Sequence, residues 1–456
     1  MFVGRVNEIK SLLKTFEIPS SHAIVYGNRR VGKTELVTES AKRSGLTFVS
    51  FECLKSSLQS NLNAFSRLLL EEGILPSSIL FSSFLDLFAY LNSLNRHLII
   101  LVDEYPYLYY KNDKNEIDSE FQTILGKISS NLNIVISGSH IGMMKELLMQ
   151  KNPIFGRAKT IIHLTELNYQ EASEFYPNAT DYDKVAFYGV FGGSPFVLKQ
   201  LDPNKGVEEN IAQTILNPMS SVFSYVSELY TTDLSIKDSA NAIFEAIGNS
   251  SVRHNRIEEK LHLEHNGLLS KQLKVLLDME FIEKNTPINR LGDAKKTSYF
   301  IKNNALRFYF TYIYGRQNIL GLLGPEEFFN RYINESLVTF LSHRFEEIVR
   351  SYFSIEVRLG RLNGILNIGT YYYDDSKKKK NGEFDVALKR EGGFDLIEVK
   401  FLKGKVTREM VEIELKQIAS IEEIGVKRVG FASINGFEDD VKGLAYQIEG
   451  KDLFPR

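Results

Sequence analysis

Short apolar runs alternate with amphipathic stretches up to about residue 168, which is the pattern of a parallel sheet wrapped by helices. Continuous apolar runs predict buried strands, and apolar positions that recur every three or four residues predict helices. The predicted strands are Ala23–Tyr26, Thr47–Phe51, Leu98–Val102, Asn133–Ser137 and Thr160–Leu164. The predicted helices are Lys33–Ser44, two within Ser57–Asn95, Glu116–Ser130 and Gly142–Lys151, and Pro153–Arg157 is expected to form an exposed loop.

The pattern changes beyond residue 168. A helical pattern runs to about Tyr230 and is interrupted by Phe191–Pro195, which predicts a small helical lid over 169–232. Three compact helical segments and two short strand-like runs then predict a winged helix over 233–320, a relative of the helix-turn-helix. These segments are Ala240–Gly248, Arg253–Leu261, Leu268–Met279, Phe281–Lys284 and Lys296–Ile301.

A further mixed unit is expected over 325–456, after a linker near Gly321–Pro325. Its predicted helices are Ser336–Tyr352 and Thr407–Glu422, and its predicted strands are Ile355–Leu359, Glu383–Leu388, Phe394–Phe401 and Arg428–Ile434. The aromatic cluster Arg307–Tyr314 has helical spacing and is expected in a core between domains. The predicted fold class is therefore α/β, with domains at 1–168, 169–232, 233–320 and 325–456.

The composition is that of an ordinary globular protein, with 43% hydrophobic and 25% charged residues among 456. The formal net charge is −2, so any contact with nucleic acid must come from local patches. Cys53 is the single cysteine, which excludes intrachain disulfides and fits a reducing cytosol. Since apolar runs such as Leu98–Val102 are too short to span a bilayer, we expect a soluble, cytoplasmic protein with no membrane partner.

A phosphate-binding loop is predicted between the first strand and the helix that follows it. The spacing Gly27-x4-Gly32-Lys33-Thr34 lets successive backbone N–H groups, including those of Arg30 and Val31, surround phosphate oxygens. The Lys33 ammonium would reach the β- and γ-phosphates, and the Thr34 hydroxyl would face Mg²⁺. The sequence therefore predicts ATP and Mg²⁺ as cofactors.

Polar side chains end the next apolar strands. Asp103 and Glu104 follow Leu98–Val102, where Asp103 can orient Mg²⁺ and Glu104 can activate the attacking water. Either Ser137 or Ser139 can hydrogen-bond the γ-phosphate, although a turn-forming serine is an equal alternative. Arg157 is a candidate finger for transition-state charge, against the alternative of a solvated surface arginine.

Several motifs together resemble the archaeal-type ATPase family of the AAA+/STAND group. They are Phe2–Glu8, Tyr26–Thr34, Leu101–Glu104, Ile136–Ser139, Phe155–Arg157 and Phe191–Pro195, followed by the predicted winged helix. The resemblance implies that the box formed by Gly4, Arg5 and Glu8 lies near the adenine. It also allows a homo-oligomer, with Arg157 acting in cis or in trans. Asn28 stands where many relatives have Arg, at a position that contributes little to phosphate binding.

A second candidate site lies in two predicted strands joined around Arg390–Gly393. Because strand side chains alternate, Asp385, Glu398 and Lys400 can project from one surface. Two acids can hold a divalent cation, Mg²⁺ or Mn²⁺, and a lysine can orient a hydrolytic water. The alternative is a half-buried strand pair with solvated charges.

The spacing Asp-x12-Glu-x-Lys resembles the PD-(D/E)XK nuclease signature of restriction endonucleases and Holliday-junction resolvases. The resemblance implies a restriction-endonuclease-like fold and a further glutamate from the first helix, for which Glu346 is the better match. The usual proline before the first acid is replaced here by Glu383-Phe384.

Two basic segments are candidates for contact with DNA. Lys377–Lys380 follows Tyr371–Tyr373, so the lysines can grip a phosphodiester backbone while the tyrosines pack on sugars or bases, or the run is a solvated loop. Lys271, Gln272 and Lys274 on the third helix of the predicted winged helix can enter a major groove, or that module packs internally.

The preferred interpretation is an ATPase coupled to DNA binding or cleavage by the C-terminal unit. The alternative is a nucleotide-switched regulatory or scaffolding ATPase whose C-terminal unit binds without cutting. The eight histidines, including His254, His262 and His265, show no convincing metal-ligand spacing.

Overall fold

The computed structural model describes residues 2–128, 130–229, 237–263, 267–375, 380–419 and 425–454. The chain forms two compact units. The first comprises Met1–Leu167 together with Ser194–Phe196, and the second comprises Asn168–Gly193 and Val197–Arg456. Within the described residues, no helix is long and apolar enough to cross a membrane.

The first unit is built on a parallel sheet with the strand order β2-β3-β4-β1-β5. All five predicted strands are confirmed, with small shifts at their ends. They are β1 Ala23–Tyr26, β2 Thr47–Glu52, β3 Leu98–Asp103, β4 Leu132–Gly138 and β5 Thr160–His163. Both faces of β3 are buried, because Ile99 and Leu101 join one apolar cluster while Ile100 and Val102 join the other.

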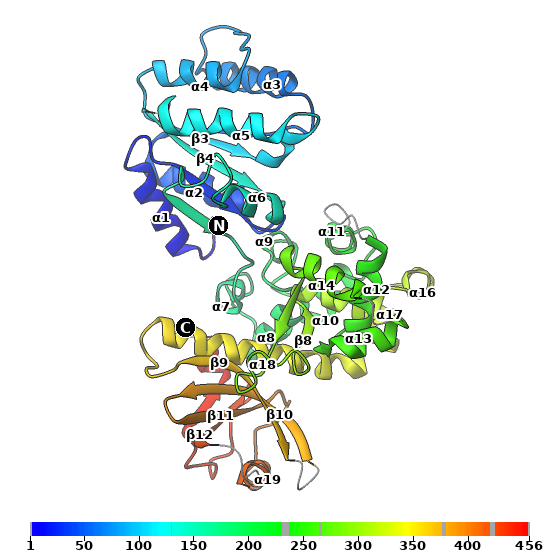
Figure 1. Cartoon of the computed structure of the whole chain (residues 1–456). Coiled ribbons are helices and arrows are strands. Elements are labelled where there is room, and N and C mark those ends of the chain that lie inside the picture. The colour runs from blue at the N-terminus through cyan, green and yellow to red at the C-terminus, as the bar shows by residue number, and fades with distance from the viewer. Residues whose placement is uncertain are drawn as a thin grey trace. The chain divides into compact units, whose positions relative to one another are not determined.

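Helices cover both faces of this sheet. They are α1 Val6–Phe16, α2 Lys33–Ser44, α3 Leu58–Glu71, α4 Phe84–Ser93, α5 Lys114–Thr123 and α6 Ile141–Leu147. Helices α1 and α2 supply the cluster on one face, while α3, α4 and α5 gather on the other (Figure 1). Helix α2 has the predicted bounds, whereas α5 passes into a π-helical turn at Ile124–Ile128 and α6 ends before the predicted Lys151.

The second unit begins with helices, as the sequence predicts. They are α7 Tyr169–Ser173, α8 Asp181–Phe191, α9 Pro195–Leu198, which starts in the first unit, α10 Val207–Gln213 and α11 Ser221–Glu228. A three-helix module with a small antiparallel sheet, ordered β6-β8-β7, follows. Its elements are α12 Lys237–Ile247, β6 Val252–Arg253, α13 His254–Leu261, α14 Leu268–Asp278, β7 Ile282–Asn285 and β8 Ser298–Ile301.

Two local predictions after this module are wrong. The linker expected at Gly321–Pro325 instead ends α16 Gln317–Leu323 and begins α17 Pro325–Tyr332. The strand expected at Ile355–Leu359 forms the last turn and C-cap of α18 Asn334–Arg358, where the Leu359 N–H donates to the Ile355 carbonyl at 2.9 Å. Alternating apolar and charged residues also fit a helix end, and the preceding helix propagates through them. Before α16, the chain forms α15 Asn304–Phe308 and a π-helical turn at Tyr309–Ile313.

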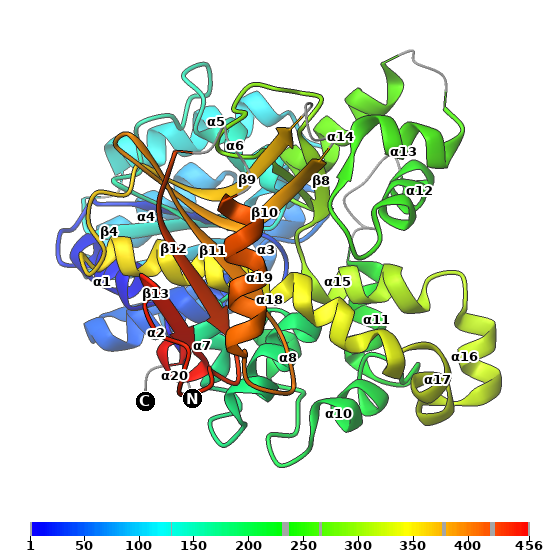
Figure 2. The same ribbon diagram turned by 90° about the horizontal axis from the view of Figure 1, so that it is seen from below.

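The C-terminal sheet has the order β13-β12-β11-β10-β9. Strands β9, β10 and β11 are antiparallel, while β12 and β13 run parallel to β11. Helices α18 and α19 lie on opposite sides of this sheet (Figures 1 and 2). The elements are β9 Asn367–Asp375, β10 Lys380–Arg390, β11 Gly393–Lys400, α19 Arg408–Ala419, β12 Val426–Ser433, β13 Tyr446–Glu449 and α20 Gly450–Leu453. Strands β9 and β13 were not predicted.

The loop between β7 and β8 docks on β9. The Ile288 N–H donates to the Thr370 carbonyl at 2.8 Å, and the Asn289 amide bonds both the carbonyl and the N–H of Tyr372. Ile288 is 4% exposed and enters the apolar cluster of the C-terminal sheet. Gly369 permits this contact, since a Cβ there would lie 2.6 Å from Ile288 Cγ2. The docked loop therefore covers the edge strand and makes the three-helix module continuous with the sheet.

Candidate functional site

The predicted phosphate-binding loop leaves the sheet at the end of β1. Gly27 must lack a side chain, because a Cβ would stand 2.0 Å from the Leu164 carbonyl oxygen. The Leu164 N–H holds this approach by donating to the Tyr26 carbonyl at 2.7 Å. Gly32 has φ 94° and caps the N-terminus of α2, so Lys33 and Thr34 occupy its first turn. The glycine spacing thus brings backbone N–H groups and a helix N-terminus to one point.

Lys33 is buried against this loop. Its ammonium donates to the carbonyls of Gly27 and Asn28, both at 3.1 Å, and to Ser139 Oγ at 3.0 Å. Burial lowers the pKa of Lys33, and the neighbouring carboxylates of Glu104 and Asp103 oppose that shift. The ammonium is thus held inside the loop, where a phosphate would replace the carbonyl oxygens as its partner.

Asp103 is fixed by hydroxyl and amide donors. The Thr34 hydroxyl donates to Asp103 Oδ2 at 2.5 Å, the Ser137 hydroxyl donates to Oδ1, and the Glu104 N–H donates to Oδ1 at 3.0 Å. Ser137 therefore contacts the aspartate. A hydroxyl and a carboxylate oxygen on one edge are hard donors of the kind that Mg²⁺ prefers, so the residues present fit this ion.

Glu104 meets Ser139 across the strand ends. The Ser139 N–H donates to Glu104 Oε2 at 3.0 Å, and its hydroxyl donates to Oε1. Glu104 has φ 50° and ψ 44°, a left-handed conformation that costs energy for a residue with a side chain. Ser139 thereby links the glutamate to the Lys33 ammonium, and the predicted residues Lys33, Glu104 and Ser139 converge.

A cavity of about 340 Å³ opens over these residues. Its lining contains the expected Arg30, Gly32, Lys33, Thr34, Glu104 and Ser139, and also Arg29, Glu35, Glu52 and Tyr107. Sequence analysis missed the latter four. Glu52 ends β2 beside Asp103 in register, so the rule that strand ends share one edge of a parallel sheet provides a signal for it. Arg29 donates to the Tyr107 hydroxyl at 2.8 Å.

Arg5 and Arg157 do not line this cavity. Arg5 is buried, and its guanidinium donates to the carbonyls of Val31 at 3.4 Å and Thr165 at 2.5 Å, so it supports the loop from behind. Glu8 is 3.9 Å from Arg5. Arg157 is exposed in the loop before β5, with its guanidinium against Gly126. Their proposed roles toward adenine and transition-state charge stay predictions.

Ser194–Phe196 packs on the phosphate-binding loop within the first unit. The Ser194 hydroxyl donates to the Arg30 carbonyl at 3.3 Å, and the Arg30 guanidinium stacks 3.7 Å from the centre of the Phe196 ring. A Cβ on Gly32 would come within 3.8 Å of Pro195. The interruption of the helical pattern at Phe191–Pro195 thus corresponds to a segment that contacts the phosphate-binding loop.

The carboxylates of Asp385 and Glu398 lie close together in the C-terminal sheet of the second unit. Val386 of β10 pairs with Ile397 of β11, which places Asp385 opposite Glu398. The Lys400 ammonium bonds Glu398 and Glu414, each at 2.9 Å. The Val399 N–H donates to Asp385 Oδ2 at 3.3 Å. The predicted face carrying Asp385, Glu398 and Lys400 is present.

These acids repel one another. Burial raises the pKa of Asp385, and the negative charges of Glu346 and Glu398 raise it further. Burial also raises the pKa of Glu398, and Lys400 opposes this. Burial opposes the charge of Lys400, but the two glutamates outweigh it and raise its pKa. A cation would relieve the repulsion, although no group of three His, Cys, Asp or Glu among the described residues is arranged to hold a metal.

The remaining candidates for DNA contact fall in three places. Lys377–Lys379 lie outside the described residues, as do the side chain of Lys380 and His265. Tyr371 and Tyr372 are each 6% exposed in β9, so the expectation that they pack on bases or sugars is wrong: Tyr371 belongs to the apolar cluster of the sheet, and the Lys296 ammonium lies 4.0 Å from the centre of the Tyr372 ring. Lys271 and Lys274 are exposed on α14.

The fold and the loop geometry of the first unit resemble those of P-loop ATPases. Residues 2–201 match a family described as an ATPase domain predominantly from Archaea, and residues 309–416 match a family described as archaeal and bacterial proteins of unknown function. The chain is thus similar to an archaeal-type ATPase domain over residues 2–201 and to a second family over residues 309–416, and the first match supports ATP binding and hydrolysis.

Individual proteins resemble the chain over most of its length. An uncharacterised protein of Methanocaldococcus jannaschii, MJECL04, is 29% identical over 385 residues, which is 82% of each chain. The Walker-type ATPase PABY2304 of Pyrococcus abyssi superposes with a TM-score of 0.52 at 14% identity, over 68% of this chain and 96% of that one. The ORC2 protein of Aeropyrum pernix gives 0.45 at 14% identity, over 70% and 95%.

Proposed function

We propose that the first unit hydrolyses Mg²⁺-bound ATP with Glu104 as the general base. The convergence of Lys33, Thr34, Glu104 and Ser139 at one cavity, with Asp103 bonded to the Thr34 hydroxyl, carries this proposal. Thr34 and Asp103 would hold Mg²⁺, directly or through water, and the ion would neutralise charge on the β- and γ-phosphates. Lys33 would leave the loop carbonyls for the phosphates, and Glu104 would accept the proton of the attacking water.

The test is Glu104→Gln, which keeps the Ser139 contact but removes the base. ATP binding should persist while turnover falls at least ~100-fold. Glu35→Gln is the matched control, because Glu35 lines the same cavity from α2. Turnover of Glu104→Gln close to that of the wild type would remove Glu104 from the mechanism.

We propose as a second function that the C-terminal unit cuts DNA with a divalent cation. The mutual repulsion of Asp385, Glu398 and Glu346 favours it, because Mg²⁺ or Mn²⁺ would neutralise these acids. Lys400, held at Glu398, would orient the water.

The sequence of elements from α12 to β8, three helices and a small antiparallel sheet, supports a winged helix. We also propose the domain limits 1–168, 169–232, 233–320 and 325–456.

Cleavage is tested on a panel of linear, branched and single-stranded DNAs with Mg²⁺ or Mn²⁺. Activity should vanish in Asp385→Ala and Lys400→Ala and persist in Lys405→Ala, an exposed lysine beyond β11. If the wild type cuts none of these DNAs, the second function fails. A nucleotide-switched scaffold that binds without cutting is then favoured.

A further inference from the structure

A cavity of about 730 Å³ lies within the second unit, between the three-helix module and the C-terminal sheet. The module contributes the loop 249–251 and the strands β7 and β8, and the other wall comes from α18, β9 and β10. Glu346 and Asp385 both line it, so the cavity opens onto the candidate metal site.

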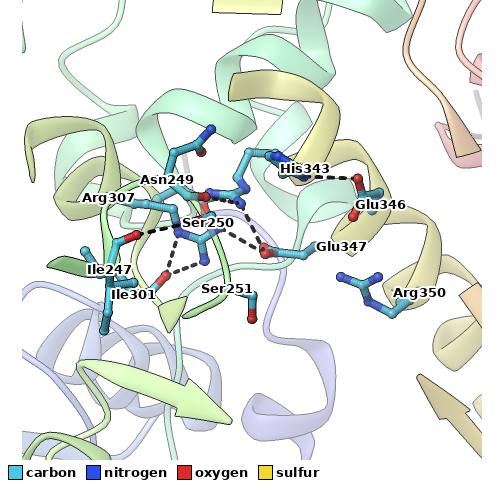
Figure 3. A network of polar contacts seen from close by, with 12 residues as sticks. Ile247, Asn249, Ser250, Ser251, Ile301, Arg307, His343, Glu346, Glu347 and Arg350 are labelled. Carbon is cyan, nitrogen blue, oxygen red and sulfur yellow. Dashed lines mark hydrogen bonds and ion pairs between the residues drawn. The ribbon is translucent and has the colours of Figure 1, made fainter. Parts of the chain in front are cut away.

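Two guanidinium groups are buried beside the cavity: Arg344 lines it, and Arg307 is not part of the lining but pairs with the lining residue Glu347. Arg307 is fully buried and donates to Glu347 Oε1 at 2.9 Å, while Arg344, 3% exposed, is 3.5 Å from the same carboxylate. Two guanidinium groups therefore share one glutamate. Figure 3 shows Arg307 and Glu347 facing each other, with His343 and Glu346 paired nearby on α18.

Arg344 is only partly compensated. One nitrogen, Nη2, donates to the Asn249 carbonyl at 3.3 Å, but the buried Nε and Nη1 have no hydrogen-bond partner among the described residues, and neither has Asn249 Oδ1. Leaving two buried guanidinium nitrogens without an acceptor is costly even beside Glu347, and this favours a hydrogen-bond acceptor such as a phosphate oxygen in the adjoining space.

The other lining residues carry both signs. Lys284, Lys302 and Arg350 border the cavity, and Arg350 donates to the Asp385 carbonyl at 2.5 Å. The lining acids are Glu283, Glu346, Glu347, Glu383 and Asp385, five against the four lysines and arginines of the lining. A phosphate-bearing ligand accompanied by a metal cation matches both sets, because phosphates pair with the basic groups while the cation joins the acids.

We propose that this cavity binds the phosphate backbone of an unpaired DNA strand and leads it to Asp385. Its volume lies in the range of pockets for small ligands, which suits one or two unstacked nucleotides and excludes a stacked duplex. The neutral side chains of Ser250, Ser251, Asn285 and Thr370 also line the cavity, and each has a hydrogen-bond partner within the unit that a sugar or base edge would replace or share. Binding of the strand in the cavity does not depend on the proposed nuclease function, whereas its delivery to Asp385 for cleavage does.

Binding is measured by fluorescence anisotropy on the full chain in EDTA, with a labelled single-stranded oligonucleotide and with its duplex. The single strand should bind more tightly. In the Lys284→Ala/Lys302→Ala variant, the slope of log Kobs against log salt should lose about 0.7 per lost phosphate contact, about 1.4 in all. The Lys271→Ala/Lys274→Ala variant is the matched control, because these exposed lysines lie on α14 outside the cavity.

Equal binding of duplex and single strand, or no binding, would overturn the proposal. The proposal would also fail if the α14 variant lost binding while the cavity variant kept it, since α14 would then hold the DNA. Thermal unfolding of both variants checks that the fold is kept. Because EDTA prevents cleavage, binding without later cleavage in Mn²⁺ refutes only the nuclease function.

Discussion

Ile288 and Gly369 should behave as one unit of packing. Ile288→Ala removes three carbon groups from a side chain that is 4% exposed. At about 0.8 kcal/mol for each group, the lost burial costs about 2.4 kcal/mol, and the cavity left behind raises this within the usual range of about 2–5 kcal/mol. Gly369→Ala should also destabilise, since its Cβ would lie 2.6 Å from Ile288 Cγ2.

The double variant distinguishes this contact from general damage. With Ile288 shortened, the new methyl group at 369 occupies space that Cγ2 has left, so the two losses should be less than additive. Leu291→Ala is the matched control, because Leu291 belongs to the same loop but is 62% exposed. It should change stability by no more than about 0.5 kcal/mol.

Hydrogen exchange is the suitable assay, since a chain of two units need not unfold in one step. The reporters are the Ile288 and Tyr372 amides, which donate across the docked loop. Both should exchange faster in Ile288→Ala and remain protected in Leu291→Ala. Equal effects of the two variants, or strict additivity of Ile288→Ala and Gly369→Ala, would refute the packing argument.

Further predictions concern the two sites. Lys33→Ala should abolish ATP binding in calorimetry, and an unchanged affinity would refute the phosphate-binding role. Arg5→Ala should weaken ATP and GTP equally if Arg5 only supports the loop, whereas a selective loss for ATP would show contact with adenine. The raised pKa of Asp385 means that the folded state holds its proton more tightly, so the stability of the metal-free protein should fall as pH rises from the ordinary aspartate range through the raised pKa. Asp385→Asn should flatten this pH profile in denaturant unfolding; an unchanged profile would exclude Asp385 as its source.

Local sequence patterns predicted the first unit well, because its strands and its phosphate-binding loop are each encoded by a short continuous stretch of sequence. Buried parallel strands are continuous apolar runs, and the spacing from Gly27 to Thr34 encodes a backbone shape. Strand β9 was not predicted because Gly369 interrupts its strand-like pattern. The glycine is needed there because Ile288, which is distant in sequence, packs against it. The false strand at Ile355–Leu359 shows that five alternating residues do not distinguish a strand from a helix end.

The same distinction separates the predicted from the missed site residues. Asp103, Glu104, Asp385 and Glu398 each end or occupy a recognisable strand, so pattern and spacing indicate them. Arg344 escaped notice because its environment depends on Glu347, Arg307 and the Asn249 carbonyl, which only the folded second unit brings together. Charged residues on an amphipathic helix are usually solvated, and nothing local marks this one as buried.

The excursion at Ser194–Phe196 means that the polypeptide passes between the two units three times, after Leu167, after Gly193 and after Phe196. Ser194–Phe196 is therefore joined to the second unit by a peptide bond at each of its two ends. Ser194 and Phe196 contact Arg30 in the phosphate-binding loop. A movement of that loop would therefore be transmitted through Ser194–Phe196 to the peptide bonds on either side of this segment. Gly192, with φ 71°, lies next to this segment, and its backbone dihedral angles can change at little steric cost when the loop moves.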